Sequence, residues 1–240
     1  MRFGDLMEIY NIAGFNVALN CGEITKRNAK KYIIPYSKDD IKVDFTIATD
    51  MSAVVAKATQ LNTSIDTMSY LYEGNEFARQ LLKRDAIWIH ASAVVVDGNA
   101  YLFSAPCGTG KSTHTSKWIE LFGKDAYIIN DDKPVVRIIG DDYFVYGSPW
   151  SGKYDISVNA RAKLKGICFL HRSKENHIDF LDKRSAIQEM MKTSSFRITQ
   201  EQLMQKLDIF DKIISNIPIY KMGCTPTVEA AKLAYDFMSK

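Results

Sequence analysis

Short apolar runs separated by Gly, Asn, Pro and Asp dominate the first sixty residues of the chain. The runs are MEIYNIAG, FNVALN, KYIIPY and KVDFTIAT. Apolar and β-branched runs of this length, bounded by turn residues, are typical of strands joined by hairpins. We therefore expect a β-rich N-terminal lobe over residues 1–68, with a structural or substrate-docking role.

Beyond this lobe the pattern alternates between strands and helices. Apolar positions at helical spacing predict a helix within SYLYEGNEFARQLLKR, and AIWIHASAVVV and AYLFSA predict two strands around the turn DGN. The stretch STHTSKWIELFG predicts a helix that ends at Gly123. Further strands are expected in AYIIN, PVVRII, YFVYG, GICFLHR, HIDFLD and IPIYKMG, and further helices over 183–192, over 200–215 and after Pro226. Residues 69–240 are therefore predicted to form one mixed α/β core.

Composition and charge exclude several classes of protein. The chain has 240 residues, is 46% hydrophobic and carries a formal net charge of +3, without a long basic block, so we expect no nucleic-acid partner. Its four cysteines form no CxxC pair, which argues against disulfides and zinc. No signal peptide and no apolar run of about 18 residues is present, so we expect a soluble, cytoplasmic protein without a membrane partner. A homo-oligomer is compatible with these numbers.

One segment carries the pattern of a phosphate-binding loop. SAPCGTGKSTH, residues 104–114, matches G-x-x-x-x-G-K-[ST], except that an alanine replaces the first glycine. The loop follows a predicted strand and precedes a predicted helix, as this motif requires. We expect it to bind ATP or another nucleoside triphosphate with Mg²⁺. The residues expected to hold the nucleotide are Ala105, Pro106, Cys107, Gly108, Thr109, Gly110, Lys111, Ser112 and Thr113.

Each physical requirement of phosphate binding has a candidate residue in this loop. Gly108 and Gly110 permit a tight turn whose N–H groups converge on an anion. Lys111 supplies a cation for the β and γ phosphates, and the Ser112 hydroxyl is a ligand for magnesium. Ala105 is tolerated if its backbone lies in the β region, where no glycine is needed.

An acidic pair lies at the end of the next predicted strand. Asp131 and Asp132 follow the apolar run AYIIN. A carboxylate beside a phosphate-binding loop holds the magnesium that bridges the phosphates, and a second carboxylate can accept the proton of an attacking hydroxyl. The alternative is an Asp-Asp-Lys-Pro turn between two strands. The short spacing to the loop favours the functional interpretation.

These features together resemble the HPr kinase/phosphorylase family. The resemblance is carried by His90 at a strand, by the loop Ala105–Ser112 and by Asp131 with Asp132. The chain is also similar to the wider group that includes ATP-dependent phosphoenolpyruvate carboxykinase. It also resembles the small HPr-kinase-like enzymes that phosphorylate serine in ribosomally made peptides.

The resemblance implies a fold, a reaction and a set of roles. The fold would be a mixed-sheet P-loop core of the HPr kinase/phosphoenolpyruvate carboxykinase type. The reaction would be phosphate transfer from a nucleotide to a hydroxyl, usually serine. Asp131 would be the general base, Asp132 would hold the metal with Ser112, and His90 would tune the acidic pair. No phosphorylase-associated region is recognised, so reverse phosphorolysis and HPr itself are not implied.

A further candidate and the choice of acceptor come from the residues themselves. Lys153 in the segment PWSGKYDISVN could reach the γ phosphate from a loop, and Arg161 is a weaker candidate. The acceptor is expected to be a serine of a peptide or protein. A small hydroxyl substrate, such as free serine or a hydroxy acid, is an alternative, and a non-catalytic ATP-binding regulatory module is another.

Overall fold

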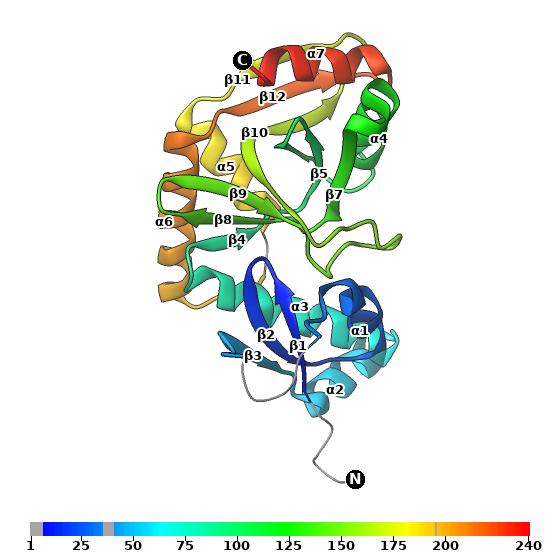
Figure 1. Ribbon diagram of the computed structural model, residues 1–240, viewed down its shortest axis with the longest axis vertical. Coiled ribbons are helices and arrows are strands. Elements are labelled where there is room, and N and C mark those ends of the chain that lie inside the picture. Colours follow the sequence, from blue (N-terminus) through cyan, green and yellow to red (C-terminus); the bar gives the residue numbers. More distant parts are fainter. Residues whose placement is uncertain (1–6, 36–40, 195) are drawn as a thin grey trace.

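A computed structural model describes residues 7–35, 41–194 and 196–240. Residues 1–6 of the predicted N-terminal lobe, and Tyr36 at the end of the predicted strand KYIIPY, lie outside these ranges. Figure 1 shows a small sheet with its helices next to the N-terminus and a larger mixed sheet with helices on both faces. The chain is thus a mixed α/β protein, as its sequence predicts.

The small sheet is built from the first predicted strands. Its order is β1-β2-β3, with β1 antiparallel to β2 and β2 parallel to β3. Ala13 and Gly14 both have positive φ between β1 and β2, which suits a two-residue hairpin whose twist matches that of the strands. The strands are β1 (Glu8–Ile12), β2 (Phe15–Asn20) and β3 (Phe45–Ala48).

Helices interrupt this lobe where the sequence pattern predicted only strands. Helices α1 (Glu23–Ala29) and α2 (Met51–Leu61) flank the sheet, and KYIIPY begins as a 3₁₀ turn over Lys30–Tyr32. The Asp50 side chain caps α2 by accepting hydrogen bonds from the N–H groups of Ser52 and Ala53. The lobe predicted as β-rich therefore contains a three-stranded sheet and also helices that the strand pattern did not indicate.

Helix α3 (Ile65–Leu82) connects the small sheet to the large one. The Ser64 hydroxyl caps it by accepting from the Thr67 N–H at 3.1 Å. The helix packs against α1, α2 and β3 and also against β4 and α6. The predicted boundary between residues 68 and 69 falls inside it, and the division into two domains stays a prediction.

The large sheet is curled and mixed. Its order is β4-β8-β9-β10-β6-β5-β7, with β12 beside β10 and β11 beside β12. Only the pairs β10–β6 and β10–β12 are parallel. The strands are β4 (Ala86–Trp88), β5 (Ala91–Val96), β6 (Asn99–Ser104), β7 (Ala126–Asp132), β8 (Val135–Ile139), β9 (Asp142–Tyr146), β10 (Arg161–Arg172), β11 (His177–Phe180) and β12 (Ile219–Cys224).

The run AIWIHASAVVV forms two strands rather than the single strand predicted. Strand β4 pairs with β8, whereas β5 pairs with β6 and β7. Between them the chain leaves the ladder: the Ile89 N–H donates to the Pro134 carbonyl at 3.1 Å and the His90 N–H to the Thr193 carbonyl at 2.8 Å. Both strands are buried, so the apolar residues on either side of His90 carry no signal for such a change of partner.

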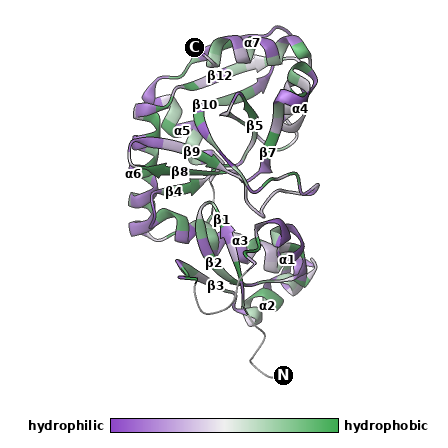
Figure 2. Cartoon of the chain, viewed as in Figure 1, coloured by the Kyte–Doolittle hydropathy of each residue, from purple (hydrophilic) through white to green (hydrophobic). Residues whose placement is uncertain are grey.

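Helices cover both faces of the large sheet. Side chains of α4 (Lys111–Phe122) and α7 (Val228–Met238) pack on one face with Val94 and Val96, and those of α5 (Lys183–Thr193) and α6 (Gln200–Asn216) pack on the other with Ala93 and Val95. This alternation along β5 follows from the two-residue period of a strand. Figure 2 shows hydrophobic colours along much of β8 and a mixture of hydrophobic and hydrophilic residues on the helices. No helix in the described residues is long and apolar enough to cross a membrane.

An aromatic cluster joins the lobe at the N-terminus to the large sheet. The Trp150 indole stacks on Phe77 of α3 at 4.7 Å between ring centroids and meets Trp88 of β4 at 6.1 Å. Its Nε1–H donates to the Tyr70 carbonyl at 3.1 Å. A Cβ on Gly74 would lie 2.6 Å from Trp150 Nε1, so this helix position has room only for glycine.

Replacing that glycine should loosen the junction. Gly74→Ala is expected to lower the free energy of unfolding by about 1–3 kcal/mol, because overpacking outweighs the better helix propensity of alanine. Urea unfolding followed by tryptophan fluorescence measures the change. Asn75→Ala, one residue along the same helix, is the control and should change stability less. A Gly74→Ala variant as stable as the wild type would contradict the packing described for Trp150.

Candidate active site

The loop between β6 and α4 has the backbone that phosphate binding requires. Gly108 and Gly110 have φ of 74° and 119°. A Cβ at either position would meet no atom within 4 Å, so glycine is needed for the backbone conformation and not for space. Ala105 is buried and is not among the residues with positive φ, which agrees with the expectation that alanine is tolerated there.

Two side chains at the start of α4 lie at the mouth of this loop. Lys111 Nζ donates to the Ala105 carbonyl at 2.9 Å, which folds the lysine back over the loop. Burial lowers the pKa of Lys111, and the nearby Asp132 opposes this shift. The Ser112 hydroxyl donates to Asp131 Oδ1 at 3.1 Å. The loop and the acidic pair, 19 residues apart at these two positions, therefore meet directly.

The two aspartates face different neighbours at the end of β7. Asp131 pairs with Ser92 of β5, whose hydroxyl lies 2.8 Å from that of Thr115 on α4, so Asp131 points to the side of α4. Asp132 instead lies 3.3 Å from His90 Nε2 and 2.9 Å from Lys133 Nζ, measured to its Oδ1. The serine expected to hold magnesium thus contacts Asp131 rather than Asp132.

Asn130 fixes this turn of the chain, and sequence reasoning missed it. Its side chain is fully buried; the carbonyl oxygen accepts from the N–H groups of Asp132 at 3.1 Å and Lys133 at 2.8 Å. Its amide donates to the Ser148 carbonyl at 2.9 Å. An asparagine before Asp-Asp at a strand end is a signal for such a turn, because its side chain bonds to the backbone two residues on.

His90 is held by its backbone and presents its ring to Asp132. Its N–H bonds to Thr193, and its carbonyl accepts from the Ser104 hydroxyl at 2.8 Å. Burial, with the charges of Lys133 and Lys111, lowers the pKa of His90 to about 4. The imidazole is therefore neutral at pH 7, and its Nε2–H can donate to the Asp132 carboxylate.

Lys153 comes from the loop 147–160, which is docked on the edge of β7. The Asp131 N–H donates to the Ile156 carbonyl at 2.9 Å, and Lys31 of the N-terminal lobe pairs with Asp155 at 3.1 Å. Lys153 is exposed at the tip, with Nζ 5.5 Å from the ring centroid of Tyr154. Arg161 lies elsewhere: its guanidinium covers the Phe144 ring at 4.9 Å.

A cavity of about 470 Å³ gathers most of the predicted residues. His90, Asp131, Asp132 and Lys153 line it together with the loop residues Cys107, Gly108, Gly110, Lys111, Ser112 and Thr113. Ala105 and Pro106 face a neighbouring cavity, and Thr109 lines neither of the two. The structure thus brings the loop, the acidic pair, His90 and Lys153 to one place, and the role of each stays a prediction.

The donor set of this cavity fits magnesium. Carboxylate and hydroxyl oxygens are hard ligands, and the Ser112 and Asp131 oxygens are already within 3.1 Å of each other. Magnesium usually keeps several waters and takes only one or two carboxylates together with substrate phosphates. Within residues 7–35, 41–194 and 196–240 no cluster of three or more His, Cys, Asp or Glu side chains suits a metal held by protein alone.

Comparison with known proteins gives distant structural likenesses. No family model matches the sequence, and no curated protein matches it. The structure is similar to that of the HPr(Ser) kinase/phosphatase from Coxiella burnetii, with 15% sequence identity and a TM-score of 0.37, over 63% of this chain and 88% of that chain. A likeness this weak leaves the function to be argued from the site itself.

A second histidine near the loop should make stability depend on pH. His114 of α4 is buried, its Nε2 accepts from Trp118 Nε1 at 3.2 Å, and burial lowers its pKa from 6.5 to about 4. Between pH 4 and pH 6.5, this histidine binds a proton in the unfolded chain but not in the folded chain. Its contribution, about 3 kcal/mol, is therefore present above pH 6.5 and lost as the pH falls towards 4.

Urea unfolding at pH 7 and pH 5 measures this effect. His90 contributes in the same direction, so His114→Gln should reduce the loss of stability at pH 5 without abolishing it. His177→Gln, at an exposed position, is the control and should leave the loss unchanged. An identical pH dependence in the wild type and His114→Gln would show that His114 is not held neutral.

Proposed function

We propose that this chain is a magnesium-dependent kinase that transfers the γ-phosphoryl group of ATP, or of another nucleoside triphosphate, to a hydroxyl. The acceptor we favour is a serine of a peptide or protein. One observation carries the proposal: the Ser112 hydroxyl and the Asp131 carboxylate meet at 3.1 Å, so the phosphate-binding loop and the acidic pair belong to one site. A loop that binds phosphate only for structure needs no second carboxylate beside it.

The geometry supports binding through the loop and the start of α4. The N–H groups around Gly108 and Gly110 and the positive end of α4 attract the β and γ phosphates. Lys111 lies over the loop, where its charge can move from the Ala105 carbonyl to a phosphate oxygen. Ser112 with one aspartate would hold magnesium, which neutralises the charge on the phosphates when bound.

The transfer itself needs few groups from the protein. The acceptor oxygen forms a bond to the γ-phosphorus while the bond from that phosphorus to the β–γ bridging oxygen breaks, and its electron pair leaves with the nucleoside diphosphate. The hydroxyl proton passes to a carboxylate of the acidic pair. Lys153 on its loop would stabilise the negative charge that spreads over the transferred group.

Two divisions of labour between the aspartates are open to test. The resemblance implies Asp131 as the base and Asp132 as the metal ligand. The contacts favour the reverse, because Asp131 accepts from Ser112 and Asp132 accepts from the neutral ring of His90. In the second version His90 holds Asp132 in the orientation needed to take a proton.

Nucleotide binding is tested at the loop lysine. Lys111→Ala should weaken magnesium-ATP binding about 10- to 100-fold, as expected for the loss of a hydrogen bond to a charged group. Calorimetric titration measures the affinity, and a thermal melt verifies the fold. Lys117→Ala is the matched control on the same helix, since Lys117 pairs with Glu120 and does not line the cavity. Equal affinities in the wild type and Lys111→Ala would refute the nucleotide site.

The acidic pair is tested by removing one charge at a time. Asp131→Asn and Asp132→Asn are made separately. The variant that removes the base should still bind magnesium-ATP, but its rate of phosphate transfer should fall about 10²- to 10⁴-fold. The other should need more magnesium and bind the nucleotide more weakly. Transfer from labelled ATP to serine peptides, free serine and hydroxy acids is measured in parallel. Tight ATP binding without ADP release or labelling of any acceptor would instead favour a regulatory ATP-binding module.

A further inference from the structure

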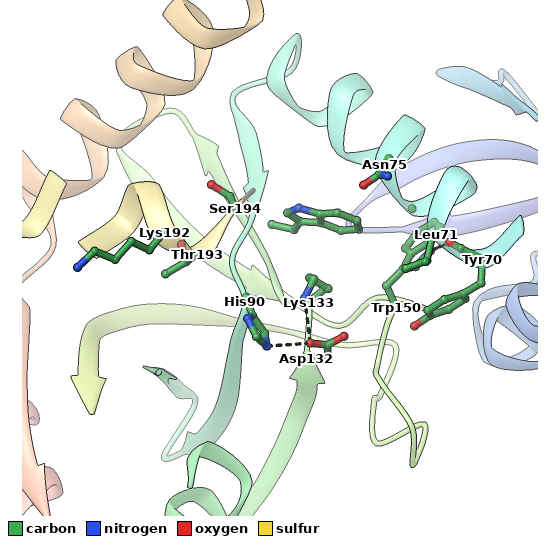
Figure 3. Close-up of a pocket in the computed structure, with 12 residues that line it drawn as sticks. Tyr70, Leu71, Asn75, His90, Asp132, Lys133, Trp150, Lys192, Thr193 and Ser194 are labelled. Atoms are coloured by element: carbon green, nitrogen blue, oxygen red, sulfur yellow. Dashed lines mark hydrogen bonds and ion pairs between the residues drawn. The ribbon is translucent and has the colours of Figure 1, made fainter. Parts of the chain in front are cut away.

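A second cavity lies on the far side of Asp132 from the phosphate loop. Its volume is about 250 Å³, and His90 and Asp132 line both this cavity and the nucleotide cavity. A group that enters it therefore comes to the same carboxylate and imidazole as the phosphates, from the opposite direction. Figure 3 shows His90 and Lys133 both paired with the Asp132 carboxylate in this cavity.

The walls of this cavity are mainly apolar and come from both parts of the fold. Helix α3 contributes Tyr70 and Leu71, and the large sheet and its loop contribute Trp88 and Trp150. The Trp150 indole stacks on Phe77 and meets Trp88 edge to face, so the shape of the cavity is set before anything binds. Leu71 is 48% exposed and stands at the mouth.

The charges around the cavity do not suit a free amino acid or hydroxy acid. Lys133 Nζ is already 2.9 Å from Asp132, and Lys192 Nζ pairs with Glu189 at 2.8 Å. Figure 3 shows the Lys192 amino group pointing away from Asp132. None of the described residues that line the cavity is an arginine. A substrate carboxylate would thus enter an apolar space without a free cation to receive it, which is costly.

The size of the cavity and the hydroxyl of Tyr70 fit a different occupant. Binding sites for drug-sized ligands measure roughly 300–1,000 Å³, so 250 Å³ is closer to the space for one large side chain. The Tyr70 hydroxyl is buried in the wall of the cavity and has no hydrogen-bond partner among the described residues. An aliphatic or aromatic side chain of a substrate would bury its surface against the indoles. Asp132 would then remain free to contact the hydroxyl of a serine next to that side chain in the substrate.

We propose that this cavity is a specificity pocket for the phosphate acceptor, and that it takes an apolar side chain next to the phosphorylated serine of a peptide. The inference rests on the proposed kinase function and adds the sequence that the enzyme selects. Burial of one such side chain corresponds to about a 10- to 100-fold preference. Helix α3, which connects the two sheets, then takes part in choosing the substrate.

The test compares peptides that differ at one position beside a single serine. Leucine peptides are expected to be phosphorylated with a kcat/KM at least about tenfold above that of aspartate peptides, and above that of free serine. Calorimetry with a non-hydrolysable ATP analogue, magnesium and peptides in which alanine replaces the serine measures the same preference without transfer. Equal labelling and equal binding of leucine and aspartate peptides at every flanking position would overturn the pocket.

Variants at the mouth assign the preference to this cavity. Leu71→Asp should remove the preference and leave magnesium-ATP affinity unchanged, and Leu71→Lys should shift it towards the aspartate peptide. Leu61→Asp is the control: Leu61 ends α2, is 55% exposed and does not line the cavity. Weaker ATP binding in Leu71→Asp would place the nucleoside there and refute the proposal.

The two proposals fail in distinguishable ways. Binding of leucine peptides that depends on Leu71, without any transfer, would support the pocket and refute the kinase. Transfer without a preference for a neighbouring residue would support the kinase and refute the pocket. Absence of both transfer and peptide binding would refute both.

Discussion

The buried amide of Asn130 is the interaction on which the rest of the site depends. One side chain satisfies two backbone N–H groups after the end of β7 and the backbone of the loop that begins at Gly147. Because buried polar groups are almost always hydrogen-bonded, these bonds fix the conformation of the backbone at this strand end. Strand alternation sends Asp131 towards α4 and Asp132 towards His90, and the asparagine holds the backbone of this strand end in place for both carboxylates.

The loop 147–160 joins the two parts of the fold through contacts of different kinds. Ser148 is bonded to Asn130, Trp150 is stacked on α3, and Asp155 is paired with Lys31. The pair of Lys31 with Asp155 is partly exposed and contributes little by itself. The buried Trp150 indole and the buried Asn130 amide therefore contribute most to holding the loop in place. Helix α3 thus forms part of the wall beside Asp132, and the small sheet is tied to that wall through loop 147–160 and α3.

The sequence predicted the features that depend on local pattern. The loop glycines, the strand before them and the helix after them follow from short-range rules, and Gly108 and Gly110 have the positive φ that the motif requires. The break at His90 was missed because the partners of β4 and β5 are distant in the chain. The helix at 51–61 was missed although Asp50 caps it, and the helix at 23–29 is short and has no side-chain cap to signal its start. The contact of Ser112 with Asp131 also depends on the long-range pairing of β5 with β7, which letters alone do not specify.

The alanine at position 105 bears on how such sites are found in other chains. A text search that insists on glycine at the first fixed place would discard this sequence, although the torsion angle there makes no demand for glycine. Only the two later glycines occupy conformations that other residues rarely adopt. A description of the motif by backbone torsions, negative at the first position and positive at the fourth and sixth, would retain this chain. Such a definition keeps the glycines that the backbone conformation requires and allows other residues at the first position of the motif.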